Sequence, residues 1–445
     1  MISPKRNSKA TTSSGFFLVE KIKFLLLEKT WIVFILILII GMYLRFYDFQ
    51  NVIGFGWDQG RDAQMVRNIL SGKLTLIGPR TGVGHMHLGP VYYYILAPFY
   101  YFTNLDPVGS DYLNILMNII NFVIIFIVTK KLFGKYNALF VTLIYSISSY
   151  LINVNQVPWN VTLMPGLAVL IFYAITQIYE QKYKWVFILW TLSGFFFNIH
   201  FTAIFIPFIN IASLIFVKEK RKVFLYSLMS IPLYVIWFVP NIIYQSQANG
   251  DTQLYKDFIH YYYIGFHFRF LMYRLPQSLV QFRSILNIPQ LYFLQYLLPI
   301  IFIVLLYFEK NVKQKLYGYI TMLWFIIPLI GFTLYGGPLS DYYFLYNAPM
   351  VLFILAYLQK KLLTLKYKSL ILTLLVIFWL FYAYINTKSL WIKPSDGGLN
   401  GQKQYVQTVI ANSKSKLFKK TIAKFKKYNE GDTDAYLYSI YTQKK

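Results

Sequence analysis

Residues 31–42 read WIVFILILIIGM and residues 370–380 read LILTLLVIFWL, and neither run contains a charged side chain. With their flanks, both approach the roughly 20 apolar residues that an α-helix needs to cross a bilayer. The 445-residue chain is 57% hydrophobic and only 13% charged, against roughly 25% charged residues in soluble domains. A water-soluble core cannot absorb this much apolar surface, so the sequence predicts an all-α polytopic membrane protein.

The basic residues lie in clusters between the apolar runs. The net charge of +26 therefore does not indicate a nucleic-acid-binding protein, which needs its basic residues on one soluble face. In short loops, an excess of Lys and Arg marks the cytoplasmic side. The clusters assigned to that side are the N-terminal residues 1–30, Lys130/Lys131/Lys135, Lys182/Lys184, Lys218/Lys220/Arg221/Lys222, Lys310/Lys313/Lys315 and Lys360/Lys361/Lys366/Lys368. The chain has no cysteine, which excludes disulfides and thiolate metal sites.

About eleven transmembrane helices place all of these clusters on one side of the membrane. The predicted spans are 31–47, 111–129, 137–153, 159–179, 185–199, 201–217, 223–243, 291–308, 316–335, 342–358 and 369–386. This topology requires that residues 88–102, LGPVYYYILAPFYYF, do not cross. That segment is short, contains two prolines and is rich in Tyr, a composition suited to the membrane interface. We therefore predict a juxtamembrane helix there.

The predicted organisation has three parts. Residues 1–30 form a cytoplasmic N-terminus, residues 31–386 form the transmembrane domain with long outer loops at 48–110 and 244–290, and residues 387–445 form an outer tail. The tail alternates apolar residues with lysines, so it either lies on the membrane surface or packs as a small cap. The expected location is the plasma (inner) membrane of the cell, with the N-terminus inside and the C-terminus outside.

The first outer loop contains two carboxylates four residues apart. Asp58 and Asp62 share one face if a helix begins here. An ionised Asp can accept a proton from a hydroxyl nucleophile, and Arg61 can offer a planar fork to a phosphate. The alternative is a helix cap with a solvated acid pair. Asp58 and Asp62 are the candidate catalytic residues.

The same loop continues with Arg80 and with two histidines, His85 and His87. Two histidines at i and i+2 can bind a metal, but no Asp, Glu or Cys lies beside them, so a divalent metal is not favoured and no cofactor is predicted. The preferred interpretation is that one histidine donates to a substrate or to a loop carbonyl. Trp159 and Asn160, in an outer turn, are candidates for stacking on and hydrogen bonding to a sugar, or for ordinary interfacial anchoring.

Two arginines in the second long outer loop, Arg269 and Arg274, complete the candidate binding residues, since they face the same compartment as Asp58 and could neutralise a lipid phosphate. Snorkelling to ordinary phospholipids is the alternative. His200 is interpreted as a structural histidine, and Tyr342 and Tyr343 as interface anchors.

Taken together, these features resemble a known family. A retained first span, an outer loop that opens with an Asp-containing helix, a His-X-Pro-type entry into a Tyr-rich stretch and a span that ends in Lys-Lys-Leu-Phe-Gly are similar to the polyprenyl-phosphate-sugar-dependent glycosyltransferases of the GT-C fold. The nearest groups are the protein mannosyltransferases of family 39 and the bacterial aminoarabinose transferases. The resemblance covers about residues 31–220 well and the rest as general span layout.

The resemblance implies a membrane enzyme of the cell envelope. It would move a sugar from a polyprenyl-phosphate donor to an acceptor hydroxyl outside the membrane, with inversion at the anomeric carbon. Asp58 matches the family's first-loop Asp, while Gln59 stands where the family usually has Glu, and His87 and Pro90 stand near its His-Pro-Pro-Leu motif. The acceptor, whether glycan, lipid or protein, is not identified. A lipid-linked glycan polymerase or ligase, or a multi-span transporter, is the alternative.

Overall fold

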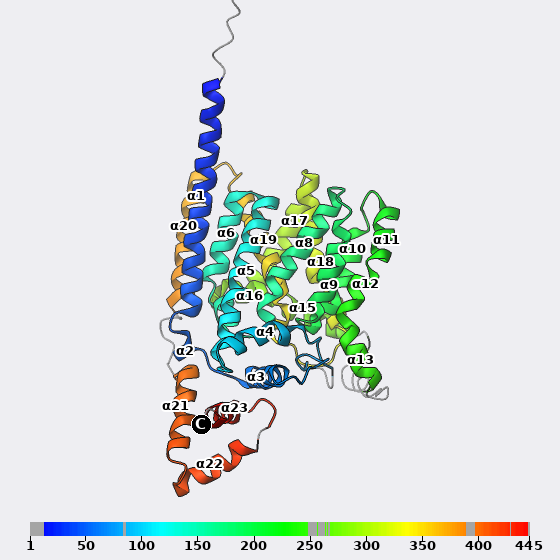
Figure 1. The fold of residues 1–445 in the computed structure, drawn as a ribbon. Helices are drawn as coiled ribbons and strands as arrows, with labels where there is room; N and C mark the ends of the chain where they lie inside the picture. The colour runs from blue at the N-terminus through cyan, green and yellow to red at the C-terminus, as the bar shows by residue number, and fades with distance from the viewer. Residues whose placement is uncertain are drawn as a thin grey trace, which may run out of the picture.

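The computed structural model describes residues 13–82, 86–247, 256, 263, 265, 268–388, 397–427 and 429–443. Within these residues the secondary structure is helical, with two isolated β-bridges and no β-strand. Figure 1 shows an upright bundle of helices, two helices lying across its lower end and a three-helix unit below them. The predicted all-α fold class is confirmed.

The helices follow one another closely along the chain. Up to the second long loop they are α1 (Ser13–Phe46), α2 (Phe49–Val52), α3 (Trp57–Leu70), α4 (Val91–Phe102), α5 (Val108–Phe133), α6 (Lys135–Ile147), α7 (Ser149–Gln156), η1 (Asn160–Leu163), α8 (Met164–Tyr179), α9 (Trp185–Phe197), η2 (Phe201–Phe205), α10 (Ile206–Leu214), α11 (Lys220–Met229), α12 (Ile231–Val235), η3 (Ile236–Phe238) and α13 (Val239–Gln247). Beyond that loop they are α15 (Phe268–Ser278), α16 (Val280–Leu286), η5 (Pro289–Leu291), α17 (Leu294–Tyr307), α18 (Val312–Phe332), η6 (Asp341–Asn347), α19 (Ala348–Leu362), α20 (Lys368–Lys388), α21 (Gly398–Ala411), α22 (Lys416–Lys426) and α23 (Thr433–Gln443).

Several of these helices are long and apolar enough to cross a membrane. Among the described residues, five helices meet that test, and two bent pairs raise the number to seven. The bends lie at Ser148, where the two helices meet at 64°, and at Ser230, where the angle is 48°. At the second bend Pro232 follows, and its ring nitrogen cannot donate a helix hydrogen bond. Helices or helix pairs occupy all eleven predicted segments, but a count of eleven spans remains a prediction.

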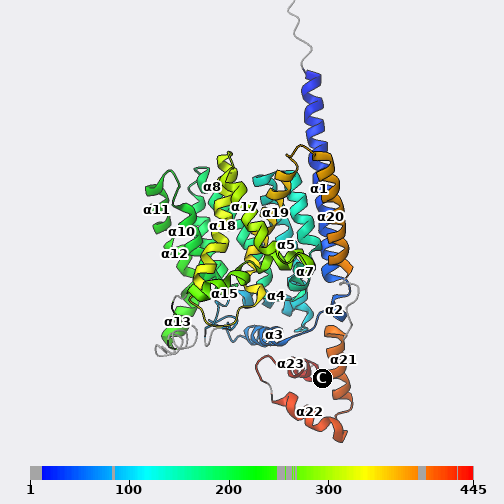
Figure 2. The ribbon, with the colours of Figure 1, turned by 180° about the vertical axis from the view of Figure 1, so that it is seen from behind.

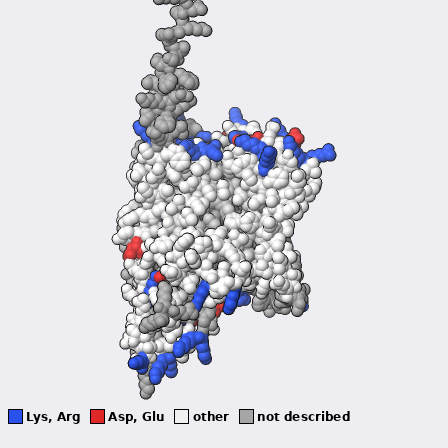
Figure 3. Space-filling model, viewed as in Figure 1, with Lys and Arg blue, Asp and Glu red and all other residues white. Residues whose placement is uncertain are grey.

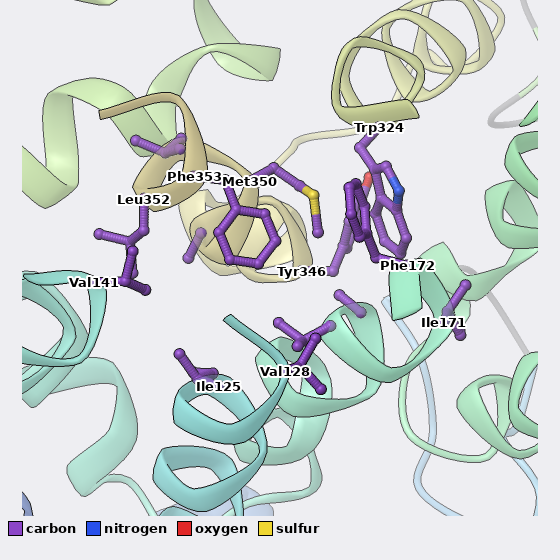
Figure 4. Packing of buried hydrophobic residues seen from close by; sticks show 14 of the residues in the cluster. Ile125, Val128, Val141, Ile171, Phe172, Trp324, Tyr346, Met350, Leu352 and Phe353 are labelled. Atoms are coloured by element: carbon purple, nitrogen blue, oxygen red, sulfur yellow. The ribbon is translucent and has the colours of Figure 1, made fainter. Parts of the chain in front are cut away.

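The centre of the bundle is packed with aromatic and branched side chains. Figure 4 shows Phe172 and Trp324 facing Met350 and Phe353 across the gap between their helices. Trp324 and Tyr346 have no exposed surface, and their ring centroids lie 5.9 Å apart. Because lipid tails are as apolar as the side chains, helix association in a membrane depends on such close packing and on hydrogen bonds between helices.

A stripe of three asparagines on α5 supplies hydrogen bonds inside the bundle. Asn114 and Asn118 donate to the carbonyl of Asn155 at 2.9 and 3.1 Å, and Asn121 donates to the carbonyl of Thr162. All three side chains are fully buried. They fix the end of α7 and the short helix η1 against α5.

Two helices of the first predicted outer loop, α3 and α4, lie across the lower end of the bundle (Figures 1 and 2). With 12 residues and a rise of about 1.5 Å per residue, α4 is about 18 Å long, less than the roughly 30 Å of a bilayer core. It packs between α3 and α5 and buries Tyr92, Tyr93 and Tyr100. That residues 88–102 do not cross the membrane remains a prediction.

Helices α21, α22 and α23, here called the C-terminal cap, pack beneath α3. Buried side chains of all three cap helices join those of α3, α4 and the start of α5 in one apolar cluster. Gln402 exchanges two hydrogen bonds with the backbone of Phe55, at 2.8 and 3.0 Å, and Lys403 forms an ion pair with Asp106 at 2.7 Å. The part of the tail that the structure describes is therefore docked on the first-loop helices.

The charged side chains lie at the two ends of the molecule. Figure 3 shows Lys and Arg gathered at the upper end of the bundle and on the lower surface of the C-terminal cap, with an almost uncharged belt between them. Such a belt is what a protein surface in contact with lipid tails requires. The chain is a multi-pass membrane protein by this pattern and by its apolar helices. The assignment of the upper end to the cytoplasm remains a prediction.

Candidate active site

Helix α3 carries the two predicted acids on adjacent turns. Its N-terminus is capped by Gln59, whose side-chain oxygen accepts the backbone N–H of Gly56 at 3.0 Å. Arg61 lies between the acids, donating to Asp58 at 2.8 Å and to Asp62 at 2.7 and 2.9 Å. The three residues form one ionic cluster, and Gln59, which stands where the resembled family usually has Glu, caps the helix.

The two aspartates differ in their environments. The side chain of Asp58 is 49% exposed, whereas that of Asp62 is 3% exposed. Burial raises the pKa of Asp62 to about 6, and the attraction of Arg61 opposes this shift. Asp62 therefore acts on Arg61 from inside the protein, while Asp58 alone of the pair offers a carboxylate to a ligand.

Asp58 faces a polar cavity of about 480 Å³, here called the acidic cavity. Its walls come from the start of α3, the following loop, and the three short helices η1, η2 and η6. The lining residues are Trp57, Asp58, Arg61, Pro79, Arg80, Thr81, Gly82, Leu88, Trp159, Asn160, Val161, His200, Phe201, Tyr342 and Tyr343. Segments more than 280 residues apart in sequence thus meet at one site.

A short hairpin-like turn carries Arg80 to this cavity. Gly78 donates to the carbonyl of Leu88 at 2.8 Å, Leu88 donates back to Pro79 at 2.9 Å, and Arg80 pairs with His87 in an antiparallel bridge. Gly78 is needed because a Cβ there would collide with the carbonyl oxygen of Gly89, and Gly89 is needed because a Cβ there would collide with the Asn198 side chain. The glycines therefore allow the two sides of the turn to approach each other closely enough to present Arg80.

His87 holds this turn instead of lining the cavity. Its Nδ1 lies 3.2 Å from the carbonyl oxygen of Gly78, which assigns the Nδ1 proton to that hydrogen bond. Burial lowers the pKa of His87, so the ring is neutral at pH 7. Of the two roles predicted for a first-loop histidine, His87 has the one of donor to a loop carbonyl.

His200 lines the cavity, although only a structural role was predicted for it. The backbone N–H of Thr202 donates to its Nδ1 at 3.3 Å, and the Thr202 hydroxyl lies 2.8 Å from the same atom. Burial lowers the pKa of His200 to about 3. A neutral ring that accepts at Nδ1 carries its proton on Nε2, so His200 is a neutral hydrogen-bond donor.

Aromatic rings form much of the wall opposite α3. Trp159 packs on Tyr342 with ring centroids 4.8 Å apart, and Tyr343 lies 5.2 Å from the His200 ring. The indole N–H of Trp159 is buried and has no hydrogen-bond partner among the described residues. Rings with one polar atom suit a sugar, which has apolar faces and hydroxyl edges.

The structure brings together half of the predicted site residues. Asp58, Arg61, Arg80, Trp159 and Asn160 line the acidic cavity, with Asn160 buried and donating to the carbonyl of Ile199. His85 lies outside the described residues. The sequence did not single out His200, Tyr342 and Tyr343 as cavity residues, because each lies at one end of an apolar run and resembles an ordinary span end.

The predicted phosphate-binding arginines Arg269 and Arg274 do not line the acidic cavity. Arg274 is buried on α15 and donates to the carbonyls of Tyr335 and Gly337, at 2.5 and 2.9 Å, and to Gln277. Its guanidinium therefore satisfies loop carbonyls that lack helix partners. Arg269, on the same helix, is exposed.

An apolar cavity of about 670 Å³ adjoins the acidic cavity and shares Phe201 as a wall. It lies between η2, α10 and α18 and is lined by Met86, Phe197, Phe201, Ile204, Phe205, Phe208, Tyr263, Ile327, Ile330, Gly331, Phe332, Leu334 and Tyr335. The two adjacent cavities fit a ligand with a polar head and a long apolar tail.

Comparison with known proteins identifies the fold. Residues 87–244 match the family described as dolichyl-phosphate-mannose-protein mannosyltransferase. No curated protein sequence matches the chain. Among solved structures, ArnT from Cupriavidus metallidurans bound to undecaprenyl phosphate is similar with 12% identity and a TM-score of 0.52, covering 75% of this chain and 60% of ArnT.

A second similar structure is the archaeal oligosaccharyltransferase AglB from Archaeoglobus fulgidus in complex with an inhibitory peptide and a dolichol-phosphate. Its identity is 10% and its TM-score 0.56, with 92% of this chain and 59% of AglB covered. The chain thus spans about 60% of the length of these proteins. The fold is that of the GT-C membrane glycosyltransferases, as the sequence resemblance predicted.

Proposed function

We propose that this protein is a membrane glycosyltransferase that moves a sugar from a polyprenyl-phosphate donor to an acceptor hydroxyl on the outer face of the membrane. The observation that carries the proposal is the shared wall at Phe201 between the acidic cavity and the apolar cavity. A polyprenyl-phosphate sugar has a matching division into a polar head and an apolar chain. ArnT and AglB, which share the fold, were solved with undecaprenyl phosphate and with a dolichol-phosphate.

The donor phosphate would lie near Arg80. A guanidinium can bind two phosphate oxygens at once. Helices α8, α10 and α19 continue η1, η2 and η6, so their N-terminal ends point toward the acidic cavity. The positive ends of these helix dipoles add to the attraction for an anion.

The sugar would lie among Trp159, Tyr342 and the His200 ring. There it can stack on the aromatic rings and accept a hydrogen bond from the Nε2–H of His200. The prenyl chain would follow Phe201 into the apolar cavity. Its transfer out of water into this cavity is favourable because the chain is apolar. This orientation directs the anomeric carbon toward α3 and its Asp58 carboxylate.

The proposed reaction is a single displacement with inversion. Asp58 accepts the proton of the acceptor hydroxyl as the oxygen forms a bond to the anomeric carbon. The bond from that carbon to the phosphate oxygen breaks, and the polyprenyl phosphate leaves with the electron pair. Arg61, held by Asp62, keeps the Asp58 carboxylate in place.

The donor class can be tested by binding. Purified protein in lipid nanodiscs is incubated with polyprenyl-monophosphate sugars, free sugar nucleotides and polyprenyl-diphosphate oligosaccharides, and the bound ligand is identified by mass spectrometry. Retention of a polyprenyl-monophosphate sugar supports the proposal. Retention of the diphosphate-linked oligosaccharide alone would favour an oligosaccharyltransferase or polymerase, a function for which the similarity to AglB is the specific observation.

A further inference from the structure

A further cavity, lined by both apolar and charged side chains, lies at the end of the bundle opposite α3. It has a volume of about 860 Å³ and opens between the end of α8, the end of α10 and the start of α18. Phe216 and Val312 line it and are 79% and 81% exposed. This cavity, here called the basic-end cavity, shares no residue with the acidic cavity.

Lysines surround the basic-end cavity in excess over carboxylates. Glu180 is paired with Lys313 at 2.6 Å, and Glu309 is paired with Lys361 at 2.7 Å. Both carboxylates are thus neutralised. Lys218 and Lys310, which also line the cavity, form no ion pair within the described part of the chain.

A buried hydroxyl adds a further hydrogen-bonding group. Tyr183 lines the cavity and is 7% exposed, and its hydroxyl has no hydrogen-bond partner among the described residues. A buried polar group without a partner destabilises the folded protein. A ligand oxygen that enters the cavity would remove this cost.

We infer that the basic-end cavity binds an anionic phospholipid. The phosphate would pair with Lys218 and Lys310, one of its oxygens would accept from Tyr183, and an acyl chain would lie along Phe216 and Val312. Anionic phospholipids are enriched in the cytoplasmic leaflet, the side to which the basic clusters assign this end. Basic pockets between transmembrane helices on that side are known to bind such headgroups.

The inference is tested by titrating the purified full-length protein in a phosphatidylcholine bilayer with phosphatidylglycerol, and measuring bound lipid by native mass spectrometry. The variant Lys218→Gln/Lys310→Gln should bind phosphatidylglycerol about tenfold or more weakly than wild type, since a hydrogen bond to a charged group contributes about 1.5 to 3 kcal/mol. Tyr183→Phe should also weaken binding, although it leaves the net charge unchanged.

The matched control is Lys184→Gln/Arg221→Gln, which removes two charges at the same end of the bundle from exposed residues that do not line the cavity. It should bind as wild type does. Equal loss of phosphatidylglycerol binding in both double variants, or no loss in Tyr183→Phe, would show that the lipid is attracted only by the surface charge and does not occupy the cavity. Displacement of phosphatidylglycerol by a smaller amount of polyprenyl phosphate would overturn the assignment to a phospholipid.

Discussion

At the scale of single residues, the environments of Asp58 and Asp62 separate their roles. Both carboxylates bind Arg61, but only Asp58 is open to the acidic cavity. Asp62 is buried, and its raised pKa, about 6, means that it loses its charge in mildly acidic solution. The charge on Asp62 is what holds Arg61 and, through it, Asp58.

This arrangement predicts an acid limb in the pH dependence of activity. As the pH falls through about 6, Asp62 takes up a proton and its hold on Arg61 weakens. Turnover should therefore decline through this range in the wild type, and the limb should disappear or move in Asp62→Asn. An unchanged acid limb in a folded Asp62→Asn sample would assign it to another group.

The same shift gives a sign for stability. The folded-state pKa of about 6 lies above the ordinary value of 3.8, so the folded protein binds this proton more tightly than the unfolded chain does. The stabilisation of the folded protein by the proton on Asp62 is present below about pH 4 and is lost as the pH rises through about 6.

Arg80 is the residue for which we predict the largest effect on donor binding. Arg80→Ala should weaken donor binding by about 1.5 to 3 kcal/mol, and Arg80→Lys should recover part of it because the charge remains but the planar fork is lost. Arg269→Ala is the matched control, since Arg269 is an exposed arginine outside the cavity. The phosphate site is elsewhere if both alanine variants bind donor as tightly as wild type.

The sequence predicted the residues of the acidic cavity that lie in the first outer loop better than those from later loops. Asp58 and Arg61 could be found because they stand together at the start of a predicted helix in the first outer loop, although Asp62, predicted to share the face of Asp58, is buried and does not line the cavity. His200 and Tyr342 could not, because their approach to α3 depends on how distant helices pack. Arg274 was predicted to bind phosphate and in the structure donates to loop carbonyls, because a buried arginine of this kind has the same sequence signal as one that binds phosphate.

At the scale of helices, the C-terminal cap supports the start of α3. Gly431, with φ of +76°, packs against the Trp57 indole, and a Cβ there would lie 2.2 Å from the indole nitrogen. A Cβ on Gly60 would in turn lie 2.9 Å from the Thr433 side chain. The cap and the helix that carries Asp58 are therefore fitted to each other.

Gly431→Ala should therefore displace the cap and reduce turnover. The substitution adds both the strain of a positive φ, about 1 to 3 kcal/mol, and a collision with Trp57, a wall of the acidic cavity. Gly72→Ala is the matched control, because Gly72 has φ of +89° and nothing within 4 Å of its Cβ position. The measurements are proteolytic release of the cap and turnover. Equal behaviour of the two variants would mean that the cap does not support α3.

Elements with a clear period or composition were predicted well. The Tyr-rich segment was expected to be a juxtamembrane helix, and α4 occupies residues 91–102. The bends at Ser148 and Ser230 were not expected, since hydropathy averages over a bend. For the tail, the sequence did not distinguish between a helix on the membrane surface and a small cap, because the apolar residues that its apolar face packs against lie on α3 and α4.

At the scale of the whole molecule, the predicted topology rests on the basic clusters. The absence of cysteine allows single substitutions at Thr103, Gly134 and Lys220 to be probed with an impermeant thiol reagent. Labelling from outside is expected for Thr103→Cys and not for the other two, because Lys and Arg favour the cytoplasmic side. Protection at position 103 together with labelling at position 134 would reverse the model of the membrane orientation.

The fold class and the GT-C resemblance could be predicted from the sequence because both depend on apolar runs and on local motifs. The apolar cavity could not, since its walls come from η2, α10 and α18, and nothing in the spacing of those residues indicates that they leave a space. The basic-end cavity could not be predicted either, because lysines in a short cytoplasmic loop are expected from the topology and do not by themselves indicate a binding site.

We propose Asp58 as the base in sugar transfer from a polyprenyl-phosphate donor, and measuring turnover tests this role. Wild type and Asp58→Asn are incubated with the donor that the binding panel identifies and with a set of hydroxyl acceptors, and released polyprenyl phosphate is measured by mass spectrometry. Wild type should release it, and Asp58→Asn should do so about a hundredfold to ten-thousandfold more slowly, with donor binding nearly unchanged. Near wild-type release by folded Asp58→Asn would mean that Asp58 is not the base.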